Sequence, residues 1–204
     1  MQLETIFAFL SASALLAIMP GPDVIYVITQ SITNGKKYGI ATALGLVSGV
    51  IMHTSLIAFG ISEIIKRNTS VFLAIKIFGA LYLFYLAYQV YKIPTKLNLS
   101  EKVSKKSLFK LVKQGFIMNV LNPKVTLFFL AFFPAFINYS LPNIKEQIVI
   151  LGILFTVQSF IIFSILAILA DKMTSVLIKN TAFEKSLRAI QITVFISLGI
   201  FILI

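Results

Sequence analysis

Two ionisable residues, Asp23 and Lys124, lie inside long apolar stretches, and each directly follows a proline. The first stretch contains "MPGPDV" from Met19 onward, and the second contains "LNPKVT" from Leu121 onward. Proline lacks a backbone N–H, and its ring clashes with the carbonyl four residues earlier, so a helix breaks at each site. Charges inside a membrane segment usually face the protein interior and serve function. We therefore expect Asp23 and Lys124 to face a common interior near the middle of a bilayer.

The same breaks also create helix starts. Pro22 and Pro123 suit the first position of a helix, and Asn122 is a suitable N-cap. The free amide groups and the positive dipole end of such a helix attract a carboxylate. With Asp23 available for an ammonium and Lys124 for a carboxylate, the groups match a zwitterion. An inert Asp23–Lys124 ion pair is the alternative, but it does not explain the broken helices.

The composition indicates an all-α polytopic membrane protein. The chain has 204 residues, is 58% hydrophobic and only 12% charged, and has a mean hydropathy of +0.97. A soluble domain carries about twice that charged fraction. Because about 20 apolar residues span a bilayer as a helix, we predict six transmembrane helices. These cover residues 5–33, 38–61, 69–91, 108–138, 146–170 and 185–204.

The six segments predict a single transport domain, residues 1–204, made of two inverted three-helix repeats. The first repeat covers residues 1–91, and the second covers residues 108–204. The basic stretch between them, residues 92–107, is the expected cytoplasmic linker. Two three-helix halves joined by one loop have opposite orientations. In this arrangement Pro22 corresponds to Pro123, and prolines at matching places in two halves mark a transporter's binding site.

The net charge of +11 is unevenly distributed over the predicted loops. With the linker in the cytoplasm, thirteen basic residues lie inside: Lys36, Lys37, Lys92, Lys96, Lys102, Lys105, Lys106, Lys110, Lys113, Lys172, Lys179, Lys185 and Arg188. Three lie outside: Lys66, Arg67 and Lys145. The positive-inside rule therefore predicts both termini on the outer face and explains the pI without nucleic acid.

Several classes of function are excluded by residues that the chain lacks. With no cysteine and one histidine, His53, it cannot form a thiolate nucleophile or a Cys- or His-rich metal site. We therefore expect no enzyme activity and no cofactor. Exporters of other small solutes or of metal cations remain alternatives, although cations need several oxygen ligands and Asp23 is the one deep carboxylate. His53 fits a proton relay with Asp23 and a hydrogen-bonded interior position equally well.

Three other features have simpler explanations. Gly45 and Gly49 form a GxxxG pattern, which close helix packing explains. Gln158 and Gln191 are expected to join helices by hydrogen bonds, and Lys76 to extend toward the outer interface.

The chain resembles the LysE/RhtB family of bacterial amino-acid exporters, the lysine and homoserine/threonine exporters. Three stretches carry the resemblance: "MPGPDVIYVITQSITNGKKYGIATALGLVSGVIMH", "KIFGALYLFYLAYQVYK" and "FKLVKQGFIMNVLNPKVTLFFLAFFPAF". They cover most of the first half and the fourth helix. The resemblance implies a multi-pass inner-membrane carrier that exports amino acids in exchange for protons. It is compatible with a homo-oligomer and implies no nucleic-acid partner.

The resemblance also implies which residues bind substrate or couple protons. These candidates are Gly21, Pro22, Asp23, His53, Asn119, Asn122, Pro123 and Lys124. Gly45, Lys76 and Gly79 also occupy characteristic positions. The stretch "FFPAF" differs from many relatives, because Ala135 stands where a polar glutamine is expected. That difference bears on the substrate rather than on the family.

Overall fold

The computed structural model describes residues 1–19, 21–61, 69–92, 106–172 and 181–203, and these residues form helices and short connections without a strand. The elements are α1 (Leu3–Ile18), α2 (Pro22–Asn34), α3 (Lys36–Leu56), η1 (Ile57–Ile61), α5 (Thr69–Lys92), α6 (Leu108–Val120), α7 (Pro123–Leu127), η2 (Phe128–Phe132), η3 (Phe133–Phe136), α8 (Ile144–Lys172) and α9 (Thr181–Leu203). Most of the predicted linker, as well as Lys66, Arg67 and Pro20, lies outside the described residues.

Three of these helices are long and apolar enough to cross a membrane alone: Lys36–Gly60, Ser70–Lys92 and Ile144–Lys172. Two bent pairs would add one span each, which gives up to five among the described residues. The sixth predicted span corresponds to α9, whose described apolar part, Arg188–Leu203, is shorter than a full span. The described residues are therefore all-helical in their regular structure, with three to five helices suited to a membrane, and the sixth span stays a prediction.

The first and fourth segments are broken where the sequence predicts. α1 and α2 meet at an angle of 58°, and α6 meets the helix beginning at Pro123 at 49°. Pro22 and Pro123 each occupy the first turn of the helix after the break. Asn122 is the N-cap of α7, where its Oδ1 accepts a hydrogen bond of 3.0 Å from the Lys124 backbone N–H. The predicted helix starts and the predicted cap are confirmed.

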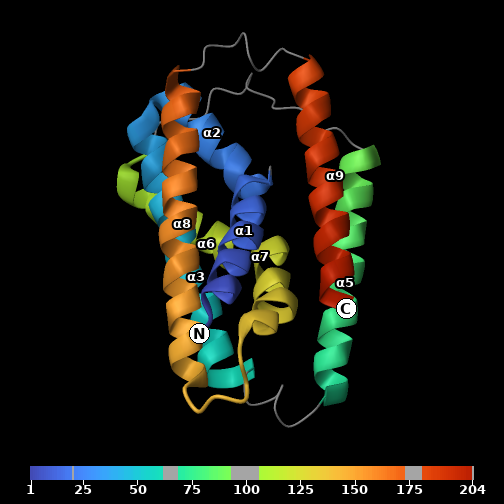
Figure 1. Cartoon of the computed structure of the whole chain (residues 1–204). Helices are drawn as coiled ribbons and strands as arrows, with labels where there is room; N and C mark the ends of the chain where they lie inside the picture. The colour runs from blue at the N-terminus through green and yellow to red at the C-terminus, as the bar shows by residue number, and fades with distance from the viewer. Residues whose placement is uncertain (20, 62–68, 93–105, 173–180, 204) are drawn as a thin grey trace.

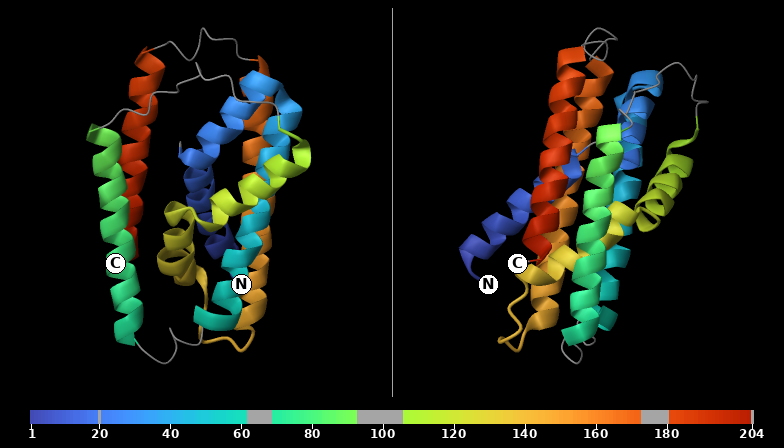
Figure 2. Two further views of the ribbon diagram at one scale, coloured as in Figure 1. Left: turned by 180° about the vertical axis from the view of Figure 1, so that it is seen from behind. Right: turned by 90° about the vertical axis from the view of Figure 1, so that its right-hand side faces the viewer.

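The helices form a bundle with a separate pair at its side (Figures 1 and 2). α3 packs along α6 and α8, α2 packs against α3 and α8, and α1 packs against α8. α5 packs mainly on α9 and touches the rest through η2. The N and C labels lie toward one end of the molecule, while α2, α5 and α8 finish at the other end (Figure 1).

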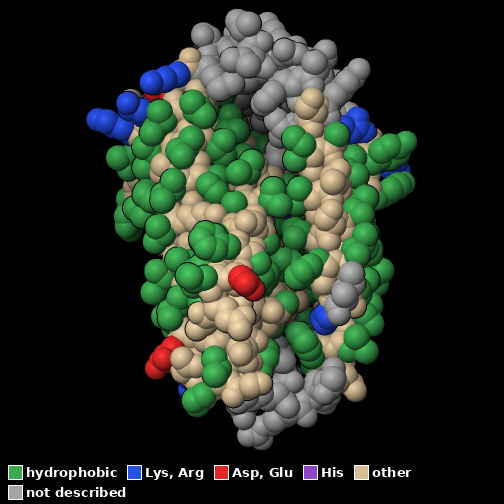
Figure 3. All heavy atoms as spheres, viewed as in Figure 1, with side chains coloured by type: hydrophobic (Ala, Val, Ile, Leu, Met, Phe, Trp, Pro, Cys, Tyr) green, Lys and Arg blue, Asp and Glu red, His purple; other side chains and the backbone are tan. Residues whose placement is uncertain are grey.

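The outer surface suits a lipid environment. Large apolar side chains on α5 and α8, such as Leu81, Phe78 and Ile153, are more than half exposed. Figure 3 shows apolar side chains over the face seen in Figure 1, with most of its Lys and Arg side chains near the upper end. A soluble monomer rarely exposes so much continuous apolar surface.

Glycines allow the backbones of α3 and α6 to touch. A Cβ on Gly45 would lie 2.1 Å from the carbonyl oxygen of Val112, and one on Gly115 would lie 2.5 Å from the carbonyl oxygen of Thr42. Gly49 faces a side chain instead, because its Cβ would lie 2.6 Å from Asn119 Oδ1. The close packing predicted from the GxxxG pattern is confirmed, and α6 is the partner helix.

Aromatic rings fill the core between α1, η2, η3 and α8. Phe9 is fully buried, and its ring centroid lies 5.3 Å from Phe136, 5.4 Å from Phe133, 6.4 Å from Phe128 and 6.5 Å from Phe155. Tilted and edge-to-face pairs at such spacing are favourable beyond the area that they bury. This cluster fixes the first half of the first segment against the second half of the fourth.

Substituting Gly115 with Ala should destabilise the bundle, because the new methyl group would meet backbone atoms that cannot move independently. We expect Gly115→Ala to lower the free energy of unfolding by about 1–3 kcal/mol. Thermal unfolding of the purified protein in detergent measures this loss. Gly60→Ala is the matched control, since no atom of the described residues lies within 4 Å of its Cβ position. Equal melting temperatures for the two variants would contradict the backbone contact between α3 and α6.

Candidate functional site

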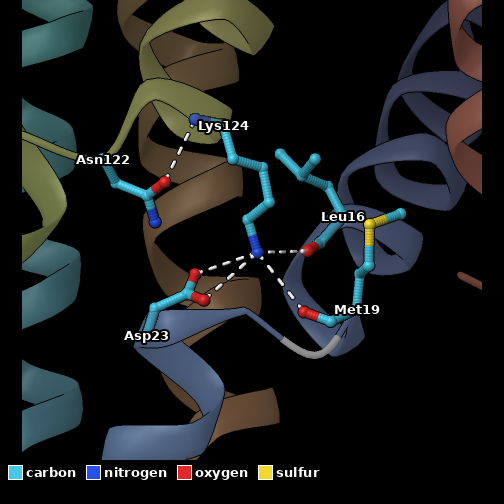
Figure 4. A network of polar contacts seen from close by, with 5 residues as sticks. All are labelled: Leu16, Met19, Asp23, Asn122 and Lys124. Atoms are coloured by element: carbon cyan, nitrogen blue, oxygen red, sulfur yellow. Dashed lines mark hydrogen bonds and ion pairs between the residues drawn. The ribbon is translucent and has the colours of Figure 1, made fainter. Parts of the chain in front are cut away.

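Asp23 and Lys124 form a buried ion pair where the two broken segments meet (Figure 4). Asp23 lies in the first turn of α2, and Lys124 is the second residue of α7. Lys124 Nζ lies 3.0 Å from Asp23 Oδ2 and 3.2 Å from Asp23 Oδ1. The two residues are 3% and 4% exposed. The expectation that both face a common interior is confirmed.

The ammonium of Lys124 also binds the end of α1. It donates to the carbonyl oxygen of Leu16 at 3.4 Å and to that of Met19 at 3.3 Å (Figure 4). The last carbonyls of a helix have no partner within the helix, and the helix dipole makes this end negative. The lysine therefore satisfies backbone acceptors that the break between α1 and α2 leaves free. We call the group of Leu16 O, Met19 O and the Asp23 carboxylate the oxygen cage.

Gly21 borders the oxygen cage and is required there for space. A Cβ at this position would lie 2.7 Å from Asp23 Oδ1 and 3.1 Å from Lys124 Nζ. Its φ of −147° and ψ of −178° are extended values that any residue adopts. Any side chain at position 21 would therefore displace the ion pair without straining the backbone.

Neither charge is stable in this buried position without the other. A single charge at the centre of a membrane helix costs about 3 kcal/mol on insertion scales. Removing one partner of a buried, hydrogen-bonded pair typically costs about 3–5 kcal/mol, because the other charge stays buried and uncompensated. Asp23 and Lys124 are therefore energetically coupled across the two breaks.

His53 lies in the interior of α3 and contacts the fourth segment. It is 4% exposed, its Nε2 lies 3.3 Å from the carbonyl oxygen of Asn119, and its ring stacks on Phe129 with centroids 5.4 Å apart. No hydrogen bond joins His53 to Asp23 in the described part of the chain. Of the two interpretations of His53, the geometry matches the hydrogen-bonded interior histidine.

A small cavity lies beside the ion pair. Its lining includes Asp23, Lys124, Asn119 and Ser159, together with apolar side chains such as Val50. It offers about 10 Å³ for the centre of a water molecule, which is room for about one water and too little for an amino acid. Asn119 Oδ1 and Ser159 Oγ are buried and have no hydrogen-bond partner among the described residues. Each of these two atoms can hydrogen-bond to a water molecule in the cavity.

The structure brings together most of the predicted site residues. Gly21, Asp23, Asn122 and Lys124 meet directly, and Asn119 lines the neighbouring cavity. Pro22 and Pro123 act through the backbone, since both side chains are exposed and each begins a helix.

Sequence reasoning missed the carbonyls of Leu16 and Met19 and the hydroxyl of Ser159. The carbonyls have no side-chain signal, although the prolines after Ile18 indicate that α1 must end nearby. Ser159 is a polar residue in the middle of the apolar α8, and this position could have marked it as a candidate site residue.

Gln158 joins α1 to α8 as expected. Its Oε1 accepts from Ser13 Oγ at 2.7 Å, and its Nε2 donates to the carbonyl oxygen of Leu10 at 2.8 Å. Lys76 is half-buried on α5, and Gly79 faces the methyl group of Ala131 in η2. In the described residues no group of three or more His, Cys, Asp or Glu side chains could hold a metal ion.

Comparison with known proteins gives the chain its family. An uncharacterized membrane protein of Bacillus subtilis, YrhP, is 28% identical and covers 97% of this chain and 98% of its own length. The homoserine/homoserine lactone efflux proteins of Salmonella typhimurium and Salmonella typhi are 30% and 31% identical, and each covers 86% of this chain and 84% of its own length. No solved structure matches the chain. The model of the family described as "LysE type translocator" matches residues 14–204, so the protein is a multi-pass membrane protein of the LysE type translocator family.

Proposed function

We propose that this protein exports amino acids or closely related small metabolites across the bacterial inner membrane in exchange for protons. The observation that carries the proposal is the buried Asp23–Lys124 pair at the meeting point of two helix breaks. An enzyme would need a nucleophile with a base or a metal site, whereas a transporter needs a binding site near the midplane formed by broken helices. Membership of a translocator family supports the second alternative.

In this proposal the substrate binds as a zwitterion. Its ammonium meets Asp23, and its carboxylate meets Lys124 and the backbone amides at the start of α7. The N-terminus of a helix stabilises a carboxylate through its free N–H groups and its dipole. The names of the two Salmonella relatives support a substrate with a primary amine, because homoserine and homoserine lactone both carry one, and homoserine is also a zwitterion.

The proposed architecture consists of six spans in two inverted repeats, residues 1–91 and 108–204, joined by a cytoplasmic linker at 92–107. Two features support it. Each half begins with a segment broken at a proline, and the two breaks meet at one site. Both termini then lie on the outer face.

The substrate class is tested by feeding dipeptides to cells with and without the gene. Peptide hydrolysis inside the cell releases free amino acids, which an exporter removes. We expect cells without the gene to accumulate several-fold more of the transported amino acid, measured by chromatography of cell extracts. The same accumulation in both strains for every dipeptide would contradict amino-acid export.

Topology is tested with a reporter that is active only outside the cytoplasm. Fused after residue 204 it should be active, and fused within residues 92–107 it should be inactive. The opposite pattern would rule out the proposed orientation.

Proton coupling is tested by Asp23→Asn, which keeps the shape of the side chain but removes its titration. In proteoliposomes we expect this variant to lose uphill transport driven by a pH gradient. Exchange of substrate down its own gradient is measured beside it, because this exchange needs no proton and is weakened only through the lost charge on the substrate-binding Asp23. If Asp23→Asn still builds a substrate gradient from a pH gradient, another group carries the proton.

A further inference from the structure

We propose that the oxygen cage is a subsite for a primary ammonium group, and that the side chain of Lys124 occupies it as a tethered ligand until substrate replaces it. The inference rests on the proposed function only for the identity of the incoming ligand. The subsite itself follows from the oxygen atoms around Lys124 Nζ (Figure 4).

The cage offers acceptors to one ammonium from two directions. The Asp23 carboxylate lies on one side, at 3.0 and 3.2 Å from Nζ. The carbonyl oxygens of Leu16 and Met19 lie at 3.4 and 3.3 Å, on the segment before the break. A primary ammonium has three N–H donors, and these acceptor groups can receive one each. A quaternary ammonium carries the same charge but has no N–H donor, so it could not satisfy the carbonyls.

The cage has room for the ammonium group of a lysine and for little else. A single methyl group on Gly21 would already lie 3.1 Å from Nζ and 2.7 Å from Asp23 Oδ1. The adjoining cavity has room for about one water. An amino acid therefore cannot enter beside Lys124, and its ammonium gains the cage only when the lysine ammonium leaves.

Replacing one ammonium with another leaves Asp23 paired both before and after the exchange. A substrate with no ammonium would have to leave the buried carboxylate uncompensated, which is strongly unfavourable. The lysine that leaves becomes available to the substrate's carboxylate. The cage thus selects the amine end of the substrate, independently of the rest of the molecule.

The test is chemical rescue of Lys124→Ala. This variant removes three methylenes and the ammonium, which n-propylammonium can replace. In detergent we expect Lys124→Ala to melt several degrees below the unsubstituted protein, and saturating n-propylammonium chloride to raise its melting temperature by about 3 °C or more. The unsubstituted protein and Lys113→Ala, which truncates an exposed lysine on α6, should not respond.

Two control ligands and one double variant distinguish binding in the cage from unspecific effects of the added ligand. Tetramethylammonium has the charge without N–H donors, and 1-propanol has the shape without the charge, so neither should rescue. Asp23→Asn with Lys124→Ala lacks the carboxylate and should show no response to n-propylammonium. Equal rescue by either control ligand, or rescue of the double variant, would overturn the proposal.

The experiment remains decisive if Lys124→Ala does not survive extraction. Membranes are then solubilised in n-propylammonium chloride or in tetramethylammonium chloride, and the yield of monodisperse protein is compared. A several-fold higher yield with n-propylammonium supports the cage, and equal yields overturn it. These readouts need no transport. Rescue together with a negative dipeptide experiment would keep the cage and reject amino-acid export, whereas absent rescue with a positive one would do the reverse.

Discussion

The ammonium of Lys124 is the group that joins the two helix breaks. A break inside an apolar segment leaves backbone carbonyls without partners, and such groups are tolerated at membrane depth only where protein or water satisfies them. Lys124 Nζ binds two carbonyls at the end of α1 and the carboxylate at the start of α2. Its own helix begins at a proline and is capped by Asn122. The side chain of Lys124, which follows the second break, therefore satisfies the backbone acceptors at the first break.

This contact requires the fourth segment to lie close to the first two. The glycines of α3 and α6 bring their backbones together, and Gly49 leaves room for Asn119 one turn before the second break. The aromatic cluster around Phe9 packs α1 against η2 and η3. The core between α2, α3 and α8 is built instead from smaller side chains such as Ala43 and Val47, with Phe163 among them. The ion pair lies where these two kinds of packing meet.

Much of this arrangement could be predicted from local features of the sequence. The prolines fixed where the helices end, and two opposite deep charges had to pair because neither is stable alone. Asn122 as a cap follows from its place before Pro123. By contrast, the choice of Leu16 and Met19 as acceptors depends on the 58° bend, which no residue type encodes. The partner of His53 was equally open, since it depends on how α3 is rotated against α6.

The carbonyls of the oxygen cage also bear on how a proton could be exchanged at Asp23. If Asp23 takes up a proton, its carboxylate no longer balances the charge of Lys124. An ammonium in apolar surroundings then needs other acceptors, and the cage retains two in the carbonyls of Leu16 and Met19, which do not titrate. A lysine paired with a carboxylate alone would lose its countercharge at that step and keep only the neutral acid's oxygens as acceptors. In the proposed exchange, the break between α1 and α2 would thus supply acceptors that an unbroken helix, with its carbonyls already bonded, does not offer.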